Sequence, residues 1–188
     1  MIVHLPSFMR KEEATPMSLQ KTINGLIRDV PDYPQPGVLF KDITPLLHDA
    51  VAFQAVVSAI AAEAGPVDKV AGLEARGFLL AAPVALELGA GLVPVRKSGK
   101  LPWETYAETY DLEYGTATIE VHRDAFAPGD RVLIVDDVLA TGGTAEAAAS
   151  LVRQTGAEVA GLSVLMELTF LNGRDRFTDL RIHSLVAV

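Results

Sequence analysis

Two adjacent carboxylates and a glycine-rich turn follow an uninterrupted apolar run in the second half of the chain. The run is Val132–Val135, the carboxylates are Asp136 and Asp137, and the turn comprises Ala140, Thr141, Gly142, Gly143 and Thr144. A glycine-rich turn that opens a helix presents unpaired backbone N–H groups and a positive dipole end, which together hold a phosphate. Carboxylates just before such a turn are poorly placed for a phosphate, but they can accept hydrogen bonds from a ribose diol. The combination predicts a phosphoribose site.

Each of these features alone has a simpler explanation, because a Gly-Gly turn is often only a turn and adjacent acids are often only solvated. Other phosphate-site signatures are missing from the sequence. It contains no Gly-x-x-x-x-Gly-Lys-Ser/Thr, which excludes a P-loop, and Pro94 stands where a dinucleotide fingerprint starting at Gly89 would need its third glycine. A strand ending in two aspartates also resembles a response-regulator receiver, but too few residues follow Asp137 for that fold.

A group of cations stands out against the acidic balance of the chain. The sequence has 24 Asp+Glu against 16 Lys+Arg and a net charge of −8, which argues against a nucleic-acid partner. Arg96, Lys97 and Lys100 nevertheless fall within RKSGKLP, and Arg76 lies in EARGF after another strand-like run. A charge run is usually a solvated loop and a lone arginine is often a helix cap. A small polyanion is the ligand that such a local patch would suit.

Strand-like runs alternate with helices of ten to fifteen residues, which predicts an α/β fold with a mostly parallel sheet covered on both faces. We expect helices at Ser18–Ile27 with Ser18 as N-cap, Ala50–Ala64 capped by Asp49, Gly77–Leu88 and Thr144–Gln154. We expect strands at Lys69–Leu73, Gly91–Val95, Thr116–His122, Arg131–Val135 and Val159–Met166, and a last one within Leu180–Val188.

Two segments are expected to be irregular. Four prolines and a glycine interrupt Pro31–Pro45, so this segment is expected to pack as a hydrophobic cover or a binding loop. Residues 96–115 form a long polar segment without an apolar period, which is typical of a mobile loop.

The remaining composition favours a soluble, cytoplasmic protein with one hydrophobic core. The chain has 188 residues and no cysteine, which excludes disulfides and thiolate metal sites. It shows no apolar segment typical of a signal peptide or a membrane span. We expect residues 1–17 to form a flexible arm and residues 18–188 a single domain.

These motifs carry a family resemblance. VLIVDDVLATGGT resembles the phosphoribosyl-pyrophosphate (PRPP) motif of type I phosphoribosyltransferases, and four further segments narrow the resemblance to the adenine phosphoribosyltransferase family. They are PDYPQPGVLFKDITPLL, GLEARGF, RKSGKLP and DLEYG. The resemblance implies a type I fold, with a hood built partly from residues 18–45 and a flexible lid at residues 96–113. It also implies transfer of phosphoribose from PRPP to adenine, giving AMP and pyrophosphate, with Mg²⁺ accompanying PRPP and a homodimeric assembly.

The resemblance implies a role for each site residue. Asp136 and Asp137 would bind the ribose, and Ala140–Thr144 the 5′-phosphate. Glu113 would take the N9 proton of adenine. The pyrophosphate would be held by Arg76, Arg96, Lys97 and Lys100, of which Arg76, Lys97 and Lys100 also act in catalysis, and the base by Leu39, Phe40 and Lys41.

Two alternatives stay open. One is a phosphoribosyltransferase for hypoxanthine, guanine or xanthine, and the other is a PRPP-binding regulator without activity. The intact RKSGKLP and DLEYG segments argue against the regulator.

Overall fold

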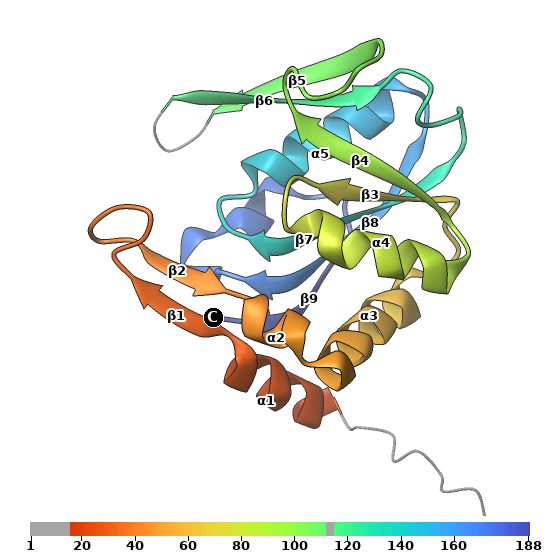
Figure 1. Cartoon of the computed structure of the whole chain (residues 1–188). Helices are drawn as coiled ribbons and strands as arrows, with labels where there is room; N and C mark the ends of the chain where they lie inside the picture. The colour runs from red at the N-terminus through yellow and green to blue at the C-terminus, as the bar shows by residue number, and fades with distance from the viewer. Residues whose placement is uncertain (1–15, 112–114) are drawn as a thin grey trace, which may run out of the picture.

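A computed structural model describes residues 16–111 and 115–188, which fold around a seven-stranded sheet (Figure 1). The strand order is β5-β6-β4-β3-β7-β8-β9, in which β4, β3, β7, β8 and β9 run parallel and β6 and β5 are antiparallel additions at one edge. The expected mostly parallel sheet is therefore confirmed. The strands are β3 (Lys69–Leu73), β4 (Gly91–Lys97), β5 (Thr105–Asp111), β6 (Thr116–His122), β7 (Arg131–Leu139), β8 (Glu158–Glu167) and β9 (Ile182–Ala187).

Helices cover both faces of the sheet, and each face has its own apolar cluster. One cluster packs α5 against the sheet, and the other packs α1 to α4 against the opposite face (Figure 1). Small side chains let α5 approach closely, because its alanines 145, 147, 148 and 149 are all buried. The helices are α1 (Pro16–Leu26), α2 (Thr44–His48), α3 (Ala50–Ala64), α4 (Gly77–Leu88) and α5 (Gly143–Gln154), with short 3₁₀ turns η1 (Thr169–Leu171) and η2 (Gly173–Arg176).

Most element boundaries agree with expectation, and the Asp49 cap of α3 is confirmed, since its carboxylate accepts hydrogen bonds from the backbone N–H groups of Val51 and Ala52. The N-terminal helix begins at Pro16, so the predicted start at Ser18 is wrong. Most of the predicted arm, residues 1–15, lies outside the described part of the chain. Strand β7 continues to Leu139, which places Asp136 and Asp137 inside the strand rather than after it.

The expectation of an irregular segment at Pro31–Pro45 is wrong. Strands β1 (Arg28–Pro31) and β2 (Leu39–Asp42) form an antiparallel hairpin. The prolines occupy places that tolerate them: Pro31 ends β1, two others lie in the connecting loop, and Pro45 opens α2. Composition alone could not indicate this hairpin, because each of its strands has only four residues.

The expectation of a continuous loop at residues 96–115 is also wrong. Arg96 and Lys97 complete β4, and residues 105–111 form β5, which pairs along its whole length with β6. Strand β5 carries no apolar alternation because it is an edge strand whose side chains are half-buried or exposed. Within the described residues, no helix is long and apolar enough to cross a membrane.

Candidate active site

Parallel strands β3 and β7 are neighbours, so the residues that follow β3 meet those near the end of β7. They enclose a cavity of about 290 Å³. A second pocket of about 70 Å³ adjoins it and is lined by the whole glycine-rich turn, residues 140–144. A larger groove of about 720 Å³ runs between β5 and α5 and does not include Arg76, Asp136 or Asp137, so we place the chemistry in the two smaller pockets. The 290 Å³ cavity is lined by Glu74, Arg76, Lys97, Asp136, Asp137 and Thr144, among others.

The glycine-rich turn caps the N-terminus of α5, where backbone N–H groups have no partner within the helix. Gly142 has φ +84°, which favours glycine, and a Cβ there would lie 2.6 Å from the Gly173 carbonyl oxygen. A Cβ on Gly143 would lie 3.1 Å from the Tyr110 ring. Packing behind the turn therefore requires glycine at position 142 and leaves little room for a side chain at position 143, whereas the sequence suggested only close approach to a ligand.

A brace behind this turn was missed by sequence reasoning. The Arg176 guanidinium donates Nε–H to the Thr141 carbonyl oxygen at 2.7 Å and forms an ion pair with Glu146 at 2.8 Å. On the other side, the Thr144 hydroxyl donates to the Tyr110 hydroxyl at 2.9 Å. No spacing signal links these residues, because the fold brings them together from β5, α5 and η2.

The two carboxylates differ in their partners. Asp137 is 5% exposed, and its Oδ2 lies 2.7 Å from Arg76 Nη2. Asp136 accepts a hydrogen bond from the Asp137 backbone N–H at 2.8 Å. Burial and the neighbouring Asp137 charge raise the pKa of Asp136 well above its ordinary value. Burial also raises the pKa of Asp137, although the Arg76 charge opposes that rise.

Gly77 allows this pair to sit against the start of α4. A Cβ on Gly77 would lie 2.8 Å from both Asp136 Oδ1 and the Val135 carbonyl oxygen. Its lack of a side chain therefore serves the approach of α4 to β7, where the sequence suggested approach to a ligand.

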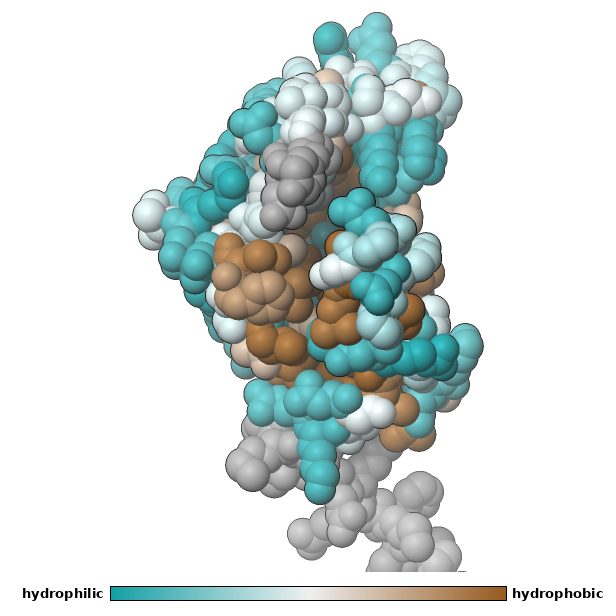
Figure 2. All heavy atoms as spheres, turned by 90° about the vertical axis from the view of Figure 1, so that its left-hand side faces the viewer, coloured by the Kyte–Doolittle hydropathy of each residue, from teal (hydrophilic) through white to brown (hydrophobic). Residues whose placement is uncertain are grey.

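Arg76 also joins this pair to the β1–β2 hairpin. Its Nη1 donates to the Lys41 carbonyl oxygen at 3.0 Å, and its guanidinium lies 4.7 Å from the centroid of the Phe40 ring. The Tyr33 ring packs edge-on against Phe40 with centroids 5.1 Å apart. Leu39 is 51% exposed and does not contact Arg76 through any hydrogen bond. Figure 2 looks onto this side of the molecule and shows apolar surface near its centre, bordered by hydrophilic surface above and below.

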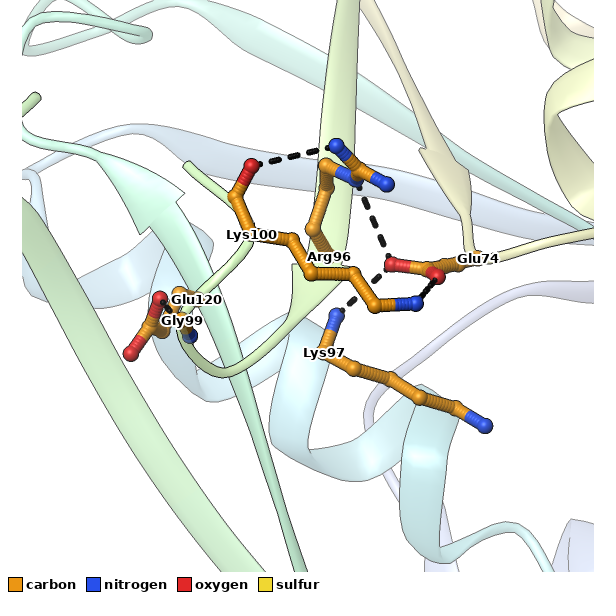
Figure 3. Close-up of polar contacts among 6 residues, drawn as sticks. All are labelled: Glu74, Arg96, Lys97, Gly99, Lys100 and Glu120. Carbon is orange, nitrogen blue, oxygen red and sulfur yellow. Dashed lines mark hydrogen bonds and ion pairs between the residues drawn. The ribbon is translucent and has the colours of Figure 1, made fainter. Parts of the chain in front are cut away.

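Of the four predicted cations, Arg76 and Lys97 line the cavity, and the segment that carries Arg96, Lys97 and Lys100 is engaged by an acid that the sequence did not single out. Glu74 accepts hydrogen bonds from Arg96 Nε at 3.3 Å and from the Lys97 backbone N–H at 3.0 Å, and it pairs with the Lys100 ammonium (Figure 3). Burial alone would raise the pKa of Glu74, but the hydrogen bonds from Lys100 and Lys97 outweigh it and hold the pKa below its usual value. The Lys97 side chain points away from this carboxylate (Figure 3).

The structure thus brings most of the predicted residues to one region. Lys41 forms a 2.7 Å ion pair with Asp29 through its side chain and meets Arg76 through its carbonyl oxygen. Glu113 lies outside the described residues. Among the described residues, the predicted ones that line the two pockets or contact Arg76 are Phe40, Lys41, Lys97, Asp136, Asp137, Ala140, Thr141, Gly142, Gly143, Thr144 and Arg76 itself. Leu39, Arg96 and Lys100 line neither pocket.

Comparison with known proteins identifies the family. Residues 47–186 match the family described as "Phosphoribosyl transferase domain". The adenine phosphoribosyltransferase of Thermobifida fusca (strain YX) is 61% identical over 168 residues, which cover 88% of this chain and 96% of that protein. The one from Streptomyces galbus is 66% identical over 161 residues, covering 85% of this chain and 88% of that protein.

Solved structures agree. Adenine phosphoribosyltransferase from Rhodothermus marinus superposes with a TM-score of 0.88 at 49% identity, covering 92% of this chain and 99% of that chain. The enzyme from Saccharomyces cerevisiae, complexed with D-2,5-dideoxy-2,5-imino-altritol 1,6-bisphosphate and adenine, gives 0.86 at 39% identity, covering 90% and 99%. This chain has the type I phosphoribosyltransferase fold and belongs to the adenine phosphoribosyltransferases, a family of pentosyltransferase enzymes.

Proposed function

We propose that this chain transfers the 5-phosphoribosyl group of PRPP to N9 of adenine, giving AMP and pyrophosphate in purine salvage. One observation carries the proposal: Arg76 contacts both the buried Asp137 beside the glycine-rich turn and the Phe40 ring of the hairpin. A sugar site and a site for a flat base are therefore adjacent. A transfer at C1′ needs the base and the pyrophosphate on opposite sides of that carbon, with the sugar held between them.

The phosphoribose is held by the end of β7 and the start of α5. The carboxylates of Asp136 and Asp137 accept hydrogen bonds from the ribose hydroxyls. The backbone N–H groups of Ala140–Thr144 and the hydroxyls of Thr141 and Thr144 bind the 5′-phosphate. The 70 Å³ pocket lined by this turn supports the assignment.

The pyrophosphate is held by Arg76, Arg96, Lys97 and Lys100. As the bond from C1′ to pyrophosphate breaks, the sugar passes through an oxocarbenium-like state and charge accumulates on the leaving oxygens. Cations fixed at that place lower the barrier by stabilising the charge, and no protein nucleophile is required. Arg76 and Lys97 line the 290 Å³ cavity, which supports this role for these two residues.

Magnesium accompanies PRPP in this proposal. Among the described residues, the carboxylates that line the 290 Å³ cavity are Glu74, Asp136 and Asp137, and Asp137 and Glu74 are already engaged by Arg76 and Lys100. This donor set fits Mg²⁺ that is held mostly by substrate oxygens and water. When bound, Mg²⁺ neutralises part of the pyrophosphate charge.

Adenine stacks on Phe40, and backbone groups near Leu39 and Lys41 read its N6 amine and N1. Hypoxanthine presents the reversed donor and acceptor pattern, so it would leave buried polar groups unpaired and be rejected by a factor of about 10⁴ or more. Glu113 takes the N9 proton. The edge-on support of Phe40 by Tyr33 is consistent with a ring held in place for stacking.

We further infer that residues 18–45 contribute to a hood over the base and that residues 96–113 act as a lid within a single domain, 18–188, preceded by an arm at residues 1–17. Strand β5 forms part of this segment, and its position with β6 at the edge of the sheet is consistent with a lid (Figure 1). A closed lid excludes water, which would otherwise hydrolyse the oxocarbenium-like species.

We also infer a cytoplasmic homodimer. Leu79 and Leu86 lie seven residues apart on α4 and are 49% and 83% exposed, and Leu92 of β4 is 47% exposed. Exposed apolar residues along one helix face suit a surface that a second copy covers. Sedimentation at several protein concentrations tests the assembly, and a monomer throughout would contradict it.

A substrate panel tests the activity. The protein with Mg²⁺ and PRPP is offered adenine, hypoxanthine, guanine and xanthine, and nucleotide formation is followed. We expect AMP formation with adenine and no nucleotide formation with the other three bases. No turnover with adenine would overturn the proposal, and PRPP binding without any turnover would indicate a regulator.

Glu113→Gln tests the proton role, because it should lower kcat far more than PRPP affinity.

A further inference from the structure

Two acids hold the turn of RKSGKLP, and they hold different parts of it. Glu74 contacts the charged groups of Arg96 and Lys100 and the Lys97 backbone N–H (Figure 3). Glu120 accepts instead from the Ser98 hydroxyl at 2.5 Å and from the Gly99 backbone N–H at 3.1 Å. One acid therefore neutralises cations, and the other fixes the backbone.

Glu74 stands at the cavity rather than behind it. Its side chain is 7% exposed, yet it lines the 290 Å³ cavity together with Arg76 and Lys97. The side chains of Arg96 and Lys100 are 33% and 45% exposed, so each is accessible to solvent while it contacts Glu74. The carboxylate thus occupies two of the cations that the proposed function assigns to pyrophosphate.

We propose that Glu74 is a competing counter-ion for the pyrophosphate site: it holds Lys100 and Arg96 while the site is empty and gives up Lys100 when pyrophosphate or PRPP binds. This inference rests on the proposed function. Breaking the Glu74–Lys100 pair is subtracted from the binding free energy, so Glu74 weakens pyrophosphate binding. Its recapture of Lys100 then favours the departure of the product.

The exchange is physically feasible because of how the cations are exposed. The Lys100 side chain is 45% exposed, so water solvates its ammonium once the pair separates. The buried Glu74 carboxylate keeps its hydrogen bonds from Arg96 Nε and the Lys97 backbone N–H. Pyrophosphate carries more charge than one carboxylate and can therefore displace it. Lys97 gives Glu74 only its backbone N–H, and its ammonium points away from Glu74, so it is free of this competition (Figure 3).

Glu120 makes the inference separable from a merely structural role. The turn is fixed by Glu120 and by the Ser98 backbone N–H, which donates to the Thr118 carbonyl oxygen at 3.0 Å. Glu74→Gln removes the competing charge but leaves these contacts in place. The amide oxygen of the glutamine can still accept the Lys97 backbone N–H.

The experiment compares Glu74→Gln with Glu120→Gln by calorimetric titration of Mg²⁺-pyrophosphate into the full chain. Glu74→Gln should bind pyrophosphate about tenfold more tightly, equivalent to ~1.4 kcal/mol. It should also release pyrophosphate more slowly in single-turnover measurements. Glu120→Gln should bind pyrophosphate no more tightly than the unmodified chain, because its turn is loosened and its cations are not freed. Ribose 5-phosphate, which contacts the glycine-rich turn, should bind both variants with unchanged affinity.

Unchanged or weaker pyrophosphate binding by Glu74→Gln would overturn the inference and assign Glu74 a structural role. Should that variant not fold, Glu74→Asp withdraws the carboxylate by one methylene and should tighten binding by a smaller factor. Failure of the proposed function gives a different result. Tighter pyrophosphate binding without AMP formation by the unmodified chain would contradict the activity alone, whereas AMP formation with unchanged pyrophosphate affinity in Glu74→Gln would contradict this inference alone.

Discussion

Arg76 Nη2 lies 2.7 Å from Asp137 Oδ2, and this ion pair joins the segment between β3 and α4 to the neighbouring strand β7 near the centre of the sheet. The same guanidinium donates to the Lys41 carbonyl oxygen and lies over the Phe40 ring. One side chain therefore links the acid assigned to the ribose with the ring assigned to the base. The resemblance implies that Arg76 binds the pyrophosphate, and from its contacts with Asp137 and Phe40 we propose that it also aligns the sugar with the base.

Arg76→Lys should separate charge from geometry. Lysine keeps the positive charge near Asp137 but cannot make the planar, forked contacts to Lys41 and Phe40. We expect kcat/KM to fall by about 10- to 100-fold, with KM rising for both adenine and PRPP. Arg181→Lys is the matched control, because Arg181 also forms a 2.7 Å ion pair, with Glu63, but on the surface. Steady-state kinetics that give equal, small effects for both variants would contradict the role of Arg76.

The glycine-rich turn was predictable because its signal is local. A buried strand, two acids and a helix-opening turn follow one another within VLIVDDVLATGGT, so the order of residues alone indicates a phosphate site. Strand β5 was not predictable, since its side chains are half-buried or exposed and leave no apolar period. The contacts of Glu74 and Arg176 were not predictable either, because their partners come from distant segments that only the folded sheet brings together.

Phe40→Leu should affect adenine more than PRPP. Leucine fills the space with apolar atoms but lacks the flat face on which a base stacks. Base stacking on an aromatic side chain contributes about 1–3 kcal/mol, so KM for adenine should rise by about tenfold. The KM for PRPP should change by less than threefold, a smaller change than for adenine. An equal rise in both would show that Phe40 acts only through Arg76, on which it packs.

Gly142→Ala should damage the phosphate site by a clash as well as by backbone strain. Gly142 has φ +84°, and an added Cβ would meet the Gly173 carbonyl oxygen at 2.6 Å. Gly129 has φ +87° with nothing within 4 Å of such a Cβ, so Gly129→Ala introduces the strain without the clash. We expect Gly142→Ala to weaken ribose 5-phosphate binding by tenfold or more, and Gly129→Ala to lower the free energy of unfolding by about 1 kcal/mol without changing that affinity. Calorimetric titration and urea unfolding measure the two effects, and equal ribose 5-phosphate affinities would contradict the packing argument.

Asp136→Asn should stabilise the fold in a manner that depends on pH. Burial and the charge of Asp137 raise the folded-state pKa of Asp136 above its unfolded value, so the folded state holds the proton more tightly. Stability is therefore lost as pH rises from the unfolded pKa through the folded pKa, and the loss is complete above it. Asparagine carries no charge and keeps an acceptor for the Asp137 backbone N–H. The free energy of unfolding of the variant should therefore exceed that of the unmodified chain at pH 8, and the gain should shrink toward pH 4. Urea unfolding at pH 4 and pH 8 measures this difference. Equal free energies of unfolding for the two proteins at pH 8 would contradict the burial argument. Weaker PRPP binding by Asp136→Asn would show that the Asp136 charge serves ribose binding at a cost in stability.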